Sequence, residues 1–476
     1  MEQKQGALQY TERMGSPTYP LRAPALQALE PMPLEKLGFL LVLFLTVAEF
    51  SRFLDLHFAS LHLPGIAQGL ALAIMLMTGA FLRASRSRIA ACMILLSVWM
   101  IVCIPTSFWR GGSLQIVTQH WSKSMMNFLL LLTLIVTVQQ CRKVFYMIAV
   151  GMTLGCLLVL AGGQTVTDRL VSAMGTYRNS NSLALALLIA MPCVIFAMKT
   201  AGAGIVRKTV CMGCLGLMTI SLLKTGSREA LIALTAVGIL LFIEGSLQQK
   251  LQLIVAALVL CATFLVAVPH ELKVRYATIF SSGTEDARTA AEASLAVSAN
   301  DSTDDRKNLL KDAIVIALHH PVFGVGAGNF APYKVHTAHD AGQRANWNGT
   351  HNTYAEFLSE EGFPGAAIFI AALVLAFKET NGLYRGAKKL KSREGSELTK
   401  LAFTWLCVLT EFAVVIFFMH GAYDYNVAVV MGISAALAAA GKLELTRLQE
   451  REREVVVQPA FSPTAVRRRL RTPTVV

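Results

Sequence analysis

The sequence has few charged residues for its length. Only 15% of the 476 residues are Asp, Glu, Lys or Arg, whereas 54% are hydrophobic. A soluble domain carries about 25% charged residues, so this composition excludes an ordinary soluble protein. The apolar segments also lack the alternating pattern of a membrane β-barrel. Because backbone groups in lipid must be satisfied within the segment, we expect an all-α integral membrane protein.

Apolar runs suited to membrane helices, which need about 20 residues each, recur about twelve times. They lie roughly at 37–54, 65–82, 89–107, 124–139, 144–162, 183–199, 208–223, 229–243, 251–268, 362–378, 401–420 and 425–441. No signal peptide is visible before the first run. The expected parts are an N-terminal segment (1–36), nine helices (37–268), a large loop (269–361), three helices (362–442) and a basic tail (443–476).

The net charge of +13 has a distribution that argues against a nucleic-acid partner. Loops between the apolar runs alternate between rich and poor in Lys and Arg, and basic loops face the cytoplasm. This pattern predicts that both termini are cytoplasmic and that the loop 269–361 lies on the opposite, periplasmic face. The basic tail, with "VRRRLR" (466–471), is either solvated or in contact with anionic lipid heads.

Disulfide and metal chemistry have little support. The sequence has nine cysteines and none lies in the loop 269–361, so no disulfide framework is indicated. "HTAHD" (336–340) offers two histidines and an aspartate, but no second matching pair stands at ligand spacing. We therefore expect no metal and no cofactor. "GVGAGN" (324–329) resembles a nucleotide-binding loop, but no strand–helix unit flanks it, and we interpret it as a turn.

Four polar residues are predicted to share the periplasmic face: Arg178, Arg228, Arg306 and His351. Arg306 lies in "DDRKNLLKDAIVIALHH" (304–320), which has the spacing of an amphipathic helix that ends before a proline. A guanidinium near a helix N-terminus suits phosphate, because it donates to two oxygens at once. The alternatives are arginines that reach lipid phosphates and a histidine without chemistry.

The residues then show a resemblance to a known family. "TGSREALIAL" (225–234), "HPVFGVGAGNF" (320–330) and the stretch "HNTYAEFLSEEGFPG" (351–365) resemble the O-antigen ligase and polymerase superfamily of bacterial inner membranes. The resemblance covers about residues 175 to 370. Ser227-Arg228-Glu229 departs from the family's usual Ser-Arg-Gly by an additional acid.

The resemblance implies a membrane glycosyltransferase of the C-type architecture, with one large periplasmic loop that contains short helices. Its donor would be a polysaccharide on undecaprenyl diphosphate, its acceptor a lipid A-core sugar hydroxyl, and its product lipopolysaccharide. In this chemistry Arg178, Arg228 and Arg306 would bind the diphosphate, whose charge grows as the sugar bond breaks. His351 would take the acceptor's proton as general base. Attack by the hydroxyl would invert the anomeric centre without a metal.

Three further residues are assigned supporting positions: Asn352, Tyr354 and Glu411. Glu411 lies within an apolar run, where an acid usually faces the helix bundle. It either holds an active-site arginine or is a neutral, hydrogen-bonded core acid. Other functions stay open: an O-antigen polymerase or a protein O-oligosaccharyltransferase of the same superfamily. A polysaccharide or lipid transporter is also open, although the sequence shows no internal repeat of the transporter kind.

Overall fold

The structure is a computed structural model that describes residues 32–166, 169–172, 175–277, 290–342, 344 and 346–457. Within these residues the regular structure is helical apart from one antiparallel hairpin, formed by β1 (Gln164–Val166) and β2 (Arg169–Val171). The predicted all-α membrane protein is confirmed. Nearly all of the predicted N-terminal segment, and the basic tail beyond residue 457, lie outside the described residues.

Each predicted apolar run overlaps a long helix. These helices are α1 (Pro33–Ser51), α3 (Leu63–Met77), α4 (Arg88–Cys103), α6 (Ser122–Leu134), α7 (Val138–Gly162), α8 (Ser180–Lys199), α9 (Ile205–Lys224), α10 (Arg228–Glu244), α11 (Leu247–Ala267), α16 (Gly362–Ala387), α17 (Arg393–Val415) and α18 (Tyr425–Val457). Nine helical segments among the described residues have the length and composition to cross a membrane. Because α1, α6 and α10 do not meet both criteria, the predicted number of twelve spans stays a prediction.

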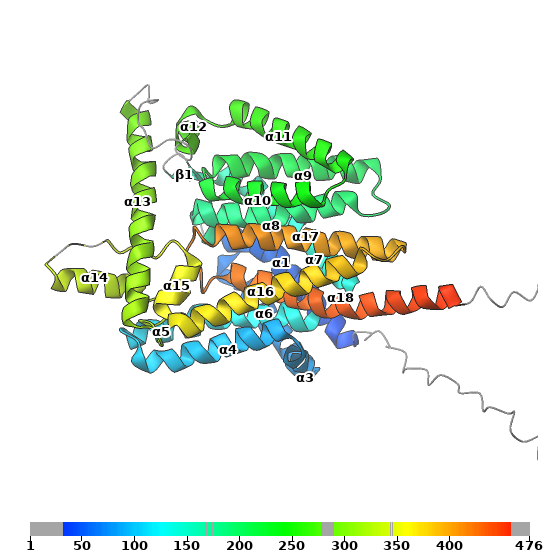
Figure 1. Ribbon diagram of the computed structural model, residues 1–476, viewed down its shortest axis with the longest axis horizontal. Coiled ribbons are helices and arrows are strands. Elements are labelled where there is room, and N and C mark those ends of the chain that lie inside the picture. The colour runs from blue at the N-terminus through cyan, green and yellow to red at the C-terminus, as the bar shows by residue number, and fades with distance from the viewer. Residues whose placement is uncertain are drawn as a thin grey trace, which may run out of the picture. The chain divides into compact units, whose positions relative to one another are not determined.

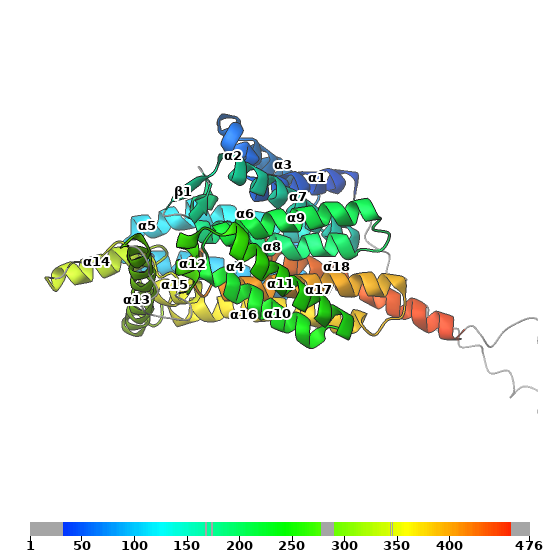
Figure 2. The ribbon, with the colours of Figure 1, turned by 90° about the horizontal axis from the view of Figure 1, so that it is seen from above.

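The remaining elements between α1 and α8 are short. They are α2 (Phe53–His57), α5 (Arg110–Gln115), the 3-10 helices η1 (Ala59–Leu61), η2 (Ala80–Arg86), η3 (Ile104–Thr106) and η5 (Thr176–Arg178), and the π-helix η4 (Ile116–Trp121). Figures 1 and 2 show that most of the long helices run in similar directions, and Figure 2 shows α2 near one end of them. The chain therefore uses its short elements to reverse direction at the ends of the bundle.

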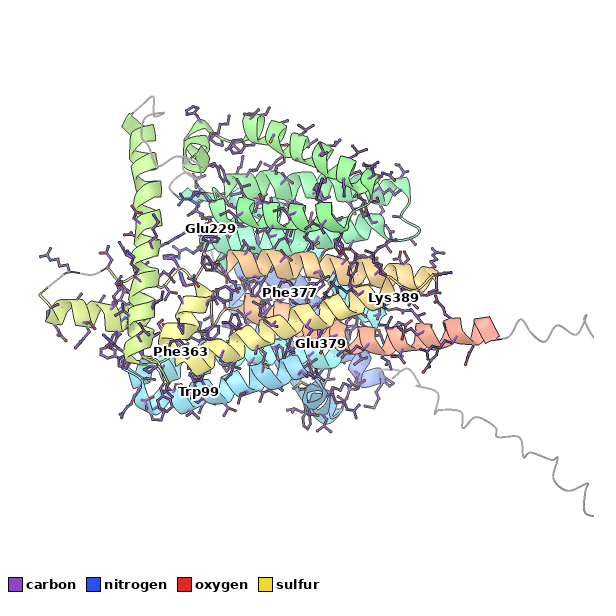
Figure 3. All side chains as sticks on the ribbon, in the orientation of Figure 1. Trp99, Glu229, Phe363, Phe377, Glu379 and Lys389 are labelled. Atoms are coloured by element: carbon purple, nitrogen blue, oxygen red, sulfur yellow. The ribbon has the colours of Figure 1, made fainter. Side chains whose placement is uncertain are left out.

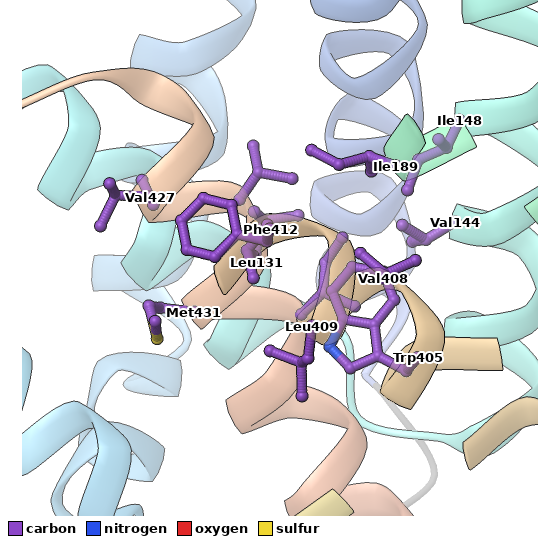
Figure 4. Packing of buried hydrophobic residues seen from close by; sticks show 14 of the residues in the cluster. Leu131, Val144, Ile148, Ile189, Trp405, Val408, Leu409, Phe412, Val427 and Met431 are labelled. Carbon is purple, nitrogen blue, oxygen red and sulfur yellow. The ribbon is translucent and has the colours of Figure 1, made fainter. Parts of the chain in front are cut away.

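A tightly packed core lies where α7, α8, α17 and α18 meet. Figure 4 shows Trp405 and Phe412 of α17 among aliphatic side chains from the neighbouring helices. Small residues permit this closeness: a Cβ on Gly432 of α18 would lie 3.0 Å from Leu131 of α6. Since lipid is as apolar as leucine, such packing contacts rather than burial from water hold membrane helices together.

Helix α11 is the opposite case. None of its side chains is buried, although the helix is apolar enough to cross a membrane. An apolar helix exposed on this scale is expected to face lipid. The contrast with the core helices indicates which side of the bundle is outermost.

The segment between α11 and α16 is the predicted large loop, and it contains four helices: α12 (His270–Ala277), α13 (Ala290–His319), α14 (Phe330–Asp340) and α15 (Thr353–Glu360). Helix α13 ends before Pro321, as predicted, and it lies across one end of the long helices (Figure 1). That end is called the α13 end below. Figure 3 shows Glu229 toward the α13 end and Lys389 toward the opposite end.

The segment leads into the next span through a break in the chain. Helix α15 ends at Glu360, and after Glu361 helix α16 starts at Gly362. Gly362 has φ +69°, and a Cβ there would lie 2.2 Å from the carbonyl oxygen of Val322. The break lets α15 turn away from α16 and pack against α13.

Candidate active site

His351 lies immediately before α15, and its surroundings are fixed by hydrogen bonds. Asn352 caps the helix, because its side-chain oxygen accepts from the Ala355 amide at 3.0 Å. The Thr353 hydroxyl donates to the Met419 carbonyl at 2.7 Å, and the Tyr354 hydroxyl donates to the Ala413 carbonyl at 3.0 Å. Thr353 and Tyr354 therefore hold α15 against α17 and the segment that follows it, and Asn352 caps the first turn of α15.

The histidine itself has an uncommon backbone and a partly buried ring. Its φ is +49°, a left-handed conformation that costs energy for a residue other than glycine and that often marks functional sites. Its ring meets the ring of His420 edge to face, with centroids 4.9 Å apart. Burial, the neighbouring His420 and the charge of Arg306 lower the pKa of His351 to about 4. At neutral pH this imidazole is uncharged and has a free lone pair for a proton.

A buried anion–cation group lies next to the histidine. Arg306 of α13 forms an ion pair with Glu229 of α10, with 2.6 Å between Nη2 and Oε1. The same carboxylate accepts from the Asn181 amide at 3.2 Å and from the Ser227 hydroxyl at 3.0 Å. Charges on Arg306 and Glu229 act in opposite directions on the pKa of His351, so the three groups share one electrostatic environment.

Two more arginines complete this group. Arg169 of β2 donates through Nε to the Thr225 carbonyl at 2.7 Å, and its guanidinium also binds the Asn181 side chain. Arg228 is the first residue of α10 and is buried. The N-termini of α8 and α10, which favour negative charge, thus meet Arg169, Arg228 and Arg306 at the α13 end. We call these helix ends and side chains the arginine group.

A turn of special shape produces this arrangement. The chain reverses between α9 and α10 at Gly226, whose φ is +62°. The Thr225 hydroxyl accepts from the Ser227 amide at 3.3 Å, which stabilises the turn. The turn places Arg228 and Glu229 side by side in the first turn of α10. The additional acid of the "SRE" sequence is accordingly a partner for Arg306 and leaves the turn intact.

The predicted site residues do not all lie in the same region of the structure. Arg228, Arg306 and His351 lie in the region just described, whereas Arg178 ends η5 with an exposed side chain, three residues before Asn181. Glu411 is buried in α17, and among the described residues no arginine forms an ion pair with it. Its burial fits the core acid, but Oε2 of Glu411 has no hydrogen-bond partner among the described residues, so the hydrogen-bonded core acid stays a prediction.

Several residues of the region were missed by the sequence analysis. They are Arg169, Asn181, Ser227 and His420, together with Glu229, which was noted only as a departure from the family pattern. His420 had a signal, since it is a polar residue at the end of an apolar run. The others contribute through contacts between distant parts of the chain.

A second set of acids, within residues 351–365, stabilises the fold. Glu360 accepts from the Gly328 amide at 2.7 Å and from the Phe330 amide at 2.9 Å, at the start of α14. Glu356 accepts from the Gly421 and Ala422 amides at 2.8 and 3.0 Å. Burial raises the pKa of Glu356 to about 7 and of Glu360 and Glu361 to about 8. We call Glu356, Glu360 and Glu361 the glutamate cluster.

The glycine-rich segment 324–329 is a turn, as predicted. Gly326 has φ +94°, and a Cβ there would lie 2.2 Å from the Ser107 hydroxyl, so the loop packs tightly on neighbouring residues. In "HTAHD" the His336 ring lies 3.1 Å from the Asp340 carboxylate, and both side chains are exposed. Among the described residues, no group of three or more His, Cys, Asp or Glu side chains is arranged to hold a metal.

Comparison with known protein families gives one match. Residues 213–370 match the family model described as O-antigen ligase. The matched region runs from within α9 into α16 and contains Arg228, Arg306 and His351, whereas Arg178, His420 and Glu411 lie outside it. No curated protein matches the chain.

Proposed function

The chain belongs to the O-antigen ligase superfamily, and from that premise we propose that it transfers an O-antigen polysaccharide from undecaprenyl diphosphate to a lipid A-core sugar. The reaction would complete lipopolysaccharide at the periplasmic face of the bacterial inner membrane. One observation carries the proposal: an uncharged histidine lies in the same electrostatic environment as Arg306, within a group of arginines that meets two helix N-termini. A proton acceptor and an anion site are the two devices that this transfer needs.

The chemistry has two parts. Diphosphate leaves from the anomeric carbon, and Arg228 and Arg306 stabilise the charge that develops on it, together with Arg178 at the end of η5. The acceptor hydroxyl attacks from the opposite side and gives its proton to His351, so the anomeric centre inverts. The energy comes from the donor's sugar–phosphate bond, which makes the proposed reaction independent of a cofactor and of a metal.

The low pKa of His351 fits this order of events. A pKa of about 4 makes a weak base, and the positive charge of Arg306 contributes to it. An anionic diphosphate beside Arg306 offsets that positive charge and raises the pKa of His351 toward neutrality. The base thus becomes stronger when the donor is bound.

Depletion of the protein in a bacterium with long-chain lipopolysaccharide tests the proposal. A ligase predicts that long chains disappear from lipid A while polymer accumulates on the lipid carrier. Lipopolysaccharide that retains a single repeat unit would instead identify a polymerase, and intact lipopolysaccharide with loss of glycan from proteins would identify a protein O-oligosaccharyltransferase. Activity in purified membranes should survive EDTA, and loss that one divalent ion restores would overturn the metal-free mechanism.

The proposed orientation has its own test. Cysteines introduced at the exposed positions Thr337 of α14 and Lys391 before α17 lie at the two ends of the helical bundle. A membrane-impermeant thiol reagent applied from the periplasm should label the first and spare the second. The reverse pattern would remove the argument for a periplasmic site.

A further inference from the structure

A second polar region lies at the α13 end. It is a hollow between the C-terminal end of α1, η5 and the N-terminal end of α18. Its polar lining consists of Glu49, Arg52, Thr176, Tyr177, Asp424, Tyr425 and Asn426. The empty space is about 350 Å³ and includes solvent at the mouth. The hollow is therefore shallow and has room for part of one sugar ring rather than for an oligosaccharide.

Its main feature is a strained, partly unpartnered arginine. Arg52 has φ +53°, although it is neither glycine nor asparagine. Its guanidinium lies 2.8 Å from Glu49 and 3.1 Å from Asp55, and over the ring of Tyr177 at 5.6 Å. Arg52 Nε is buried and has no hydrogen-bond partner among the described residues. A strained residue held in place by its neighbours is typical of functional sites.

The hollow is connected to His351 through a short, rigid turn. His420 touches His351 at one end of the turn, and Asp424 lines the hollow at the other. Glu356 accepts from the amides of Gly421 and Ala422, and the Asp424 amide donates to the Gly421 carbonyl at 3.1 Å. The turn thus fixes the hollow relative to the histidine.

The lining selects a class of ligand. Two carboxylates of the lining, Glu49 and Asp424, accompany its one arginine, Arg52, which is also paired with Asp55 outside the lining, so a phosphate is less favoured here than beside the arginine group. Carboxylates that accept, a guanidinium that donates, a hydroxyl, an amide and two tyrosines suit a neutral group with several hydroxyls. A sugar offers hydroxyls for the charged residues and an apolar face for an aromatic ring.

We propose that this hollow, formed by Glu49, Arg52, Tyr177 and Asp424, binds a sugar of the acceptor and directs one of its hydroxyls toward His351. The inference rests on the proposed function and adds the location of the acceptor. Donor and acceptor then approach the histidine from two sides: the anionic donor from the arginine group and the neutral acceptor from the hollow. This arrangement suits attack opposite to the leaving diphosphate.

The test fills the hollow without touching the charged residues. Thr176 is an exposed lining residue, so Thr176→Trp places a bulky side chain in the mouth. Ser60→Trp is the matched control, because Ser60 is exposed in η1 and is not part of the lining. Asn426→Ala removes one lining amide without adding bulk and guards against misfolding caused by the tryptophan.

The first readout is the transfer rate in proteoliposomes, with donor and with lipid A-core acceptor from a strain that lacks O antigen. Thr176→Trp should raise the KM for acceptor about tenfold or more, because the bulky side chain keeps the sugar from its hydrogen bonds to the charged residues, with an unchanged KM for donor. Asn426→Ala should show the same direction with a smaller change, and Ser60→Trp should match wild type. An unchanged acceptor KM in Thr176→Trp and Asn426→Ala, or an equal rise in donor KM, would overturn the inference.

The second readout is direct binding of core oligosaccharide, released from the lipid, to wild type and to Thr176→Trp. Binding by wild type alone supports the hollow even if wild type transfers no polymer, in which case the proposed function fails and the site stands. Equal binding by both proteins would refute the site whether or not transfer occurs.

Discussion

The arginine group and the glutamate cluster both contain buried acids at the α13 end, but different partners neutralise them. Glu229 is paired with Arg306 and stays charged within a cluster of cations. Glu360 is bound by backbone amides and by the Tyr423 hydroxyl at 2.7 Å, and burial holds its pKa near 8. The first environment attracts a second anion, whereas the second keeps its own acids uncharged at neutral pH.

The difference separates chemistry from architecture within one short stretch of sequence. His351 faces the arginine group, while the acids a few residues later hold the loops around it. Similar polar residues within 351–365 thus have different roles, which depend on the charges that the fold brings next to them. Four predictions follow from this comparison.

The largest effect is expected at Arg228. Removing one donor to a developing negative charge typically costs about 10²–10³ in turnover, and Arg228→Ala should fall in this range. Arg228→Lys keeps the charge but loses the forked geometry, so it should cost nearly as much. The measurement is the ligation rate in proteoliposomes, with monodispersity in detergent as the folding control. Activity that persists in the lysine variant would mean that Arg228 contacts only lipid.

The second prediction concerns the ion pair between Arg306 and Glu229. Arg306→Met leaves a buried carboxylate without its partner, and breaking such a pair costs about 3–5 kcal/mol. The double variant Arg306→Met with Glu229→Gln should recover most of the thermal stability, because no charge is left unpaired. It should not recover ligation, since Arg306, which is proposed to bind the diphosphate, is still missing. Recovery of both thermal stability and ligation would make Arg306 a structural residue, like the acids of the glutamate cluster.

The third prediction is the pH dependence of stability that the glutamate cluster causes. Burial raises the pKa of Glu361 in the folded state to about 8, with the charge of Glu360 adding to the effect. Its stabilising contribution is full below its ordinary pKa and is lost as pH rises through the folded value. Thermal stability should therefore fall by several degrees between pH 6.5 and 9, and Glu361→Gln should lessen that fall. His351 does not interfere, because its pKa does not exceed its ordinary value of 6.5 in either state. A fall of the same size in Glu361→Gln would mean that this carboxyl is already ionised.

Much of the fold is readable from local sequence patterns, and much of the site is not. Apolar runs marked the twelve bundle helices, and Pro321 marked the end of α13. Arg228 stood out because a charge near an apolar run is costly, and Arg306 and His351 stood out because they share its predicted membrane face. Asn181, Arg169 and His420 did not, since their positions come from contacts between distant segments. The break at Gly362 depends on a close approach by Val322, which no local pattern reveals.

The hollow illustrates the same limit. Its walls come from α1, η5 and α18, near opposite ends of the chain, and its arginine stands in an ordinary-looking "SRFLD" segment. Residues that bind a ligand together are assembled by packing, so single-sequence reasoning finds them one at a time at best. Glu411 is conspicuous as an acid in an apolar run, but the sequence left open whether it holds an arginine or is a core acid, and its burial in α17 comes from packing.

The central claim is that His351 moves the proton and the arginines hold the diphosphate. Its most direct test measures ligation rate and undecaprenyl diphosphate binding side by side in wild type, His351→Ala and Arg228→Ala. The account predicts that His351→Ala binds the lipid diphosphate like wild type but loses about 10²–10⁴ in turnover, the usual value of general-base assistance. Arg228→Ala should lose binding as well. Loss of binding in His351→Ala as severe as in Arg228→Ala, or ligation by His351→Ala near the wild-type rate, would contradict it.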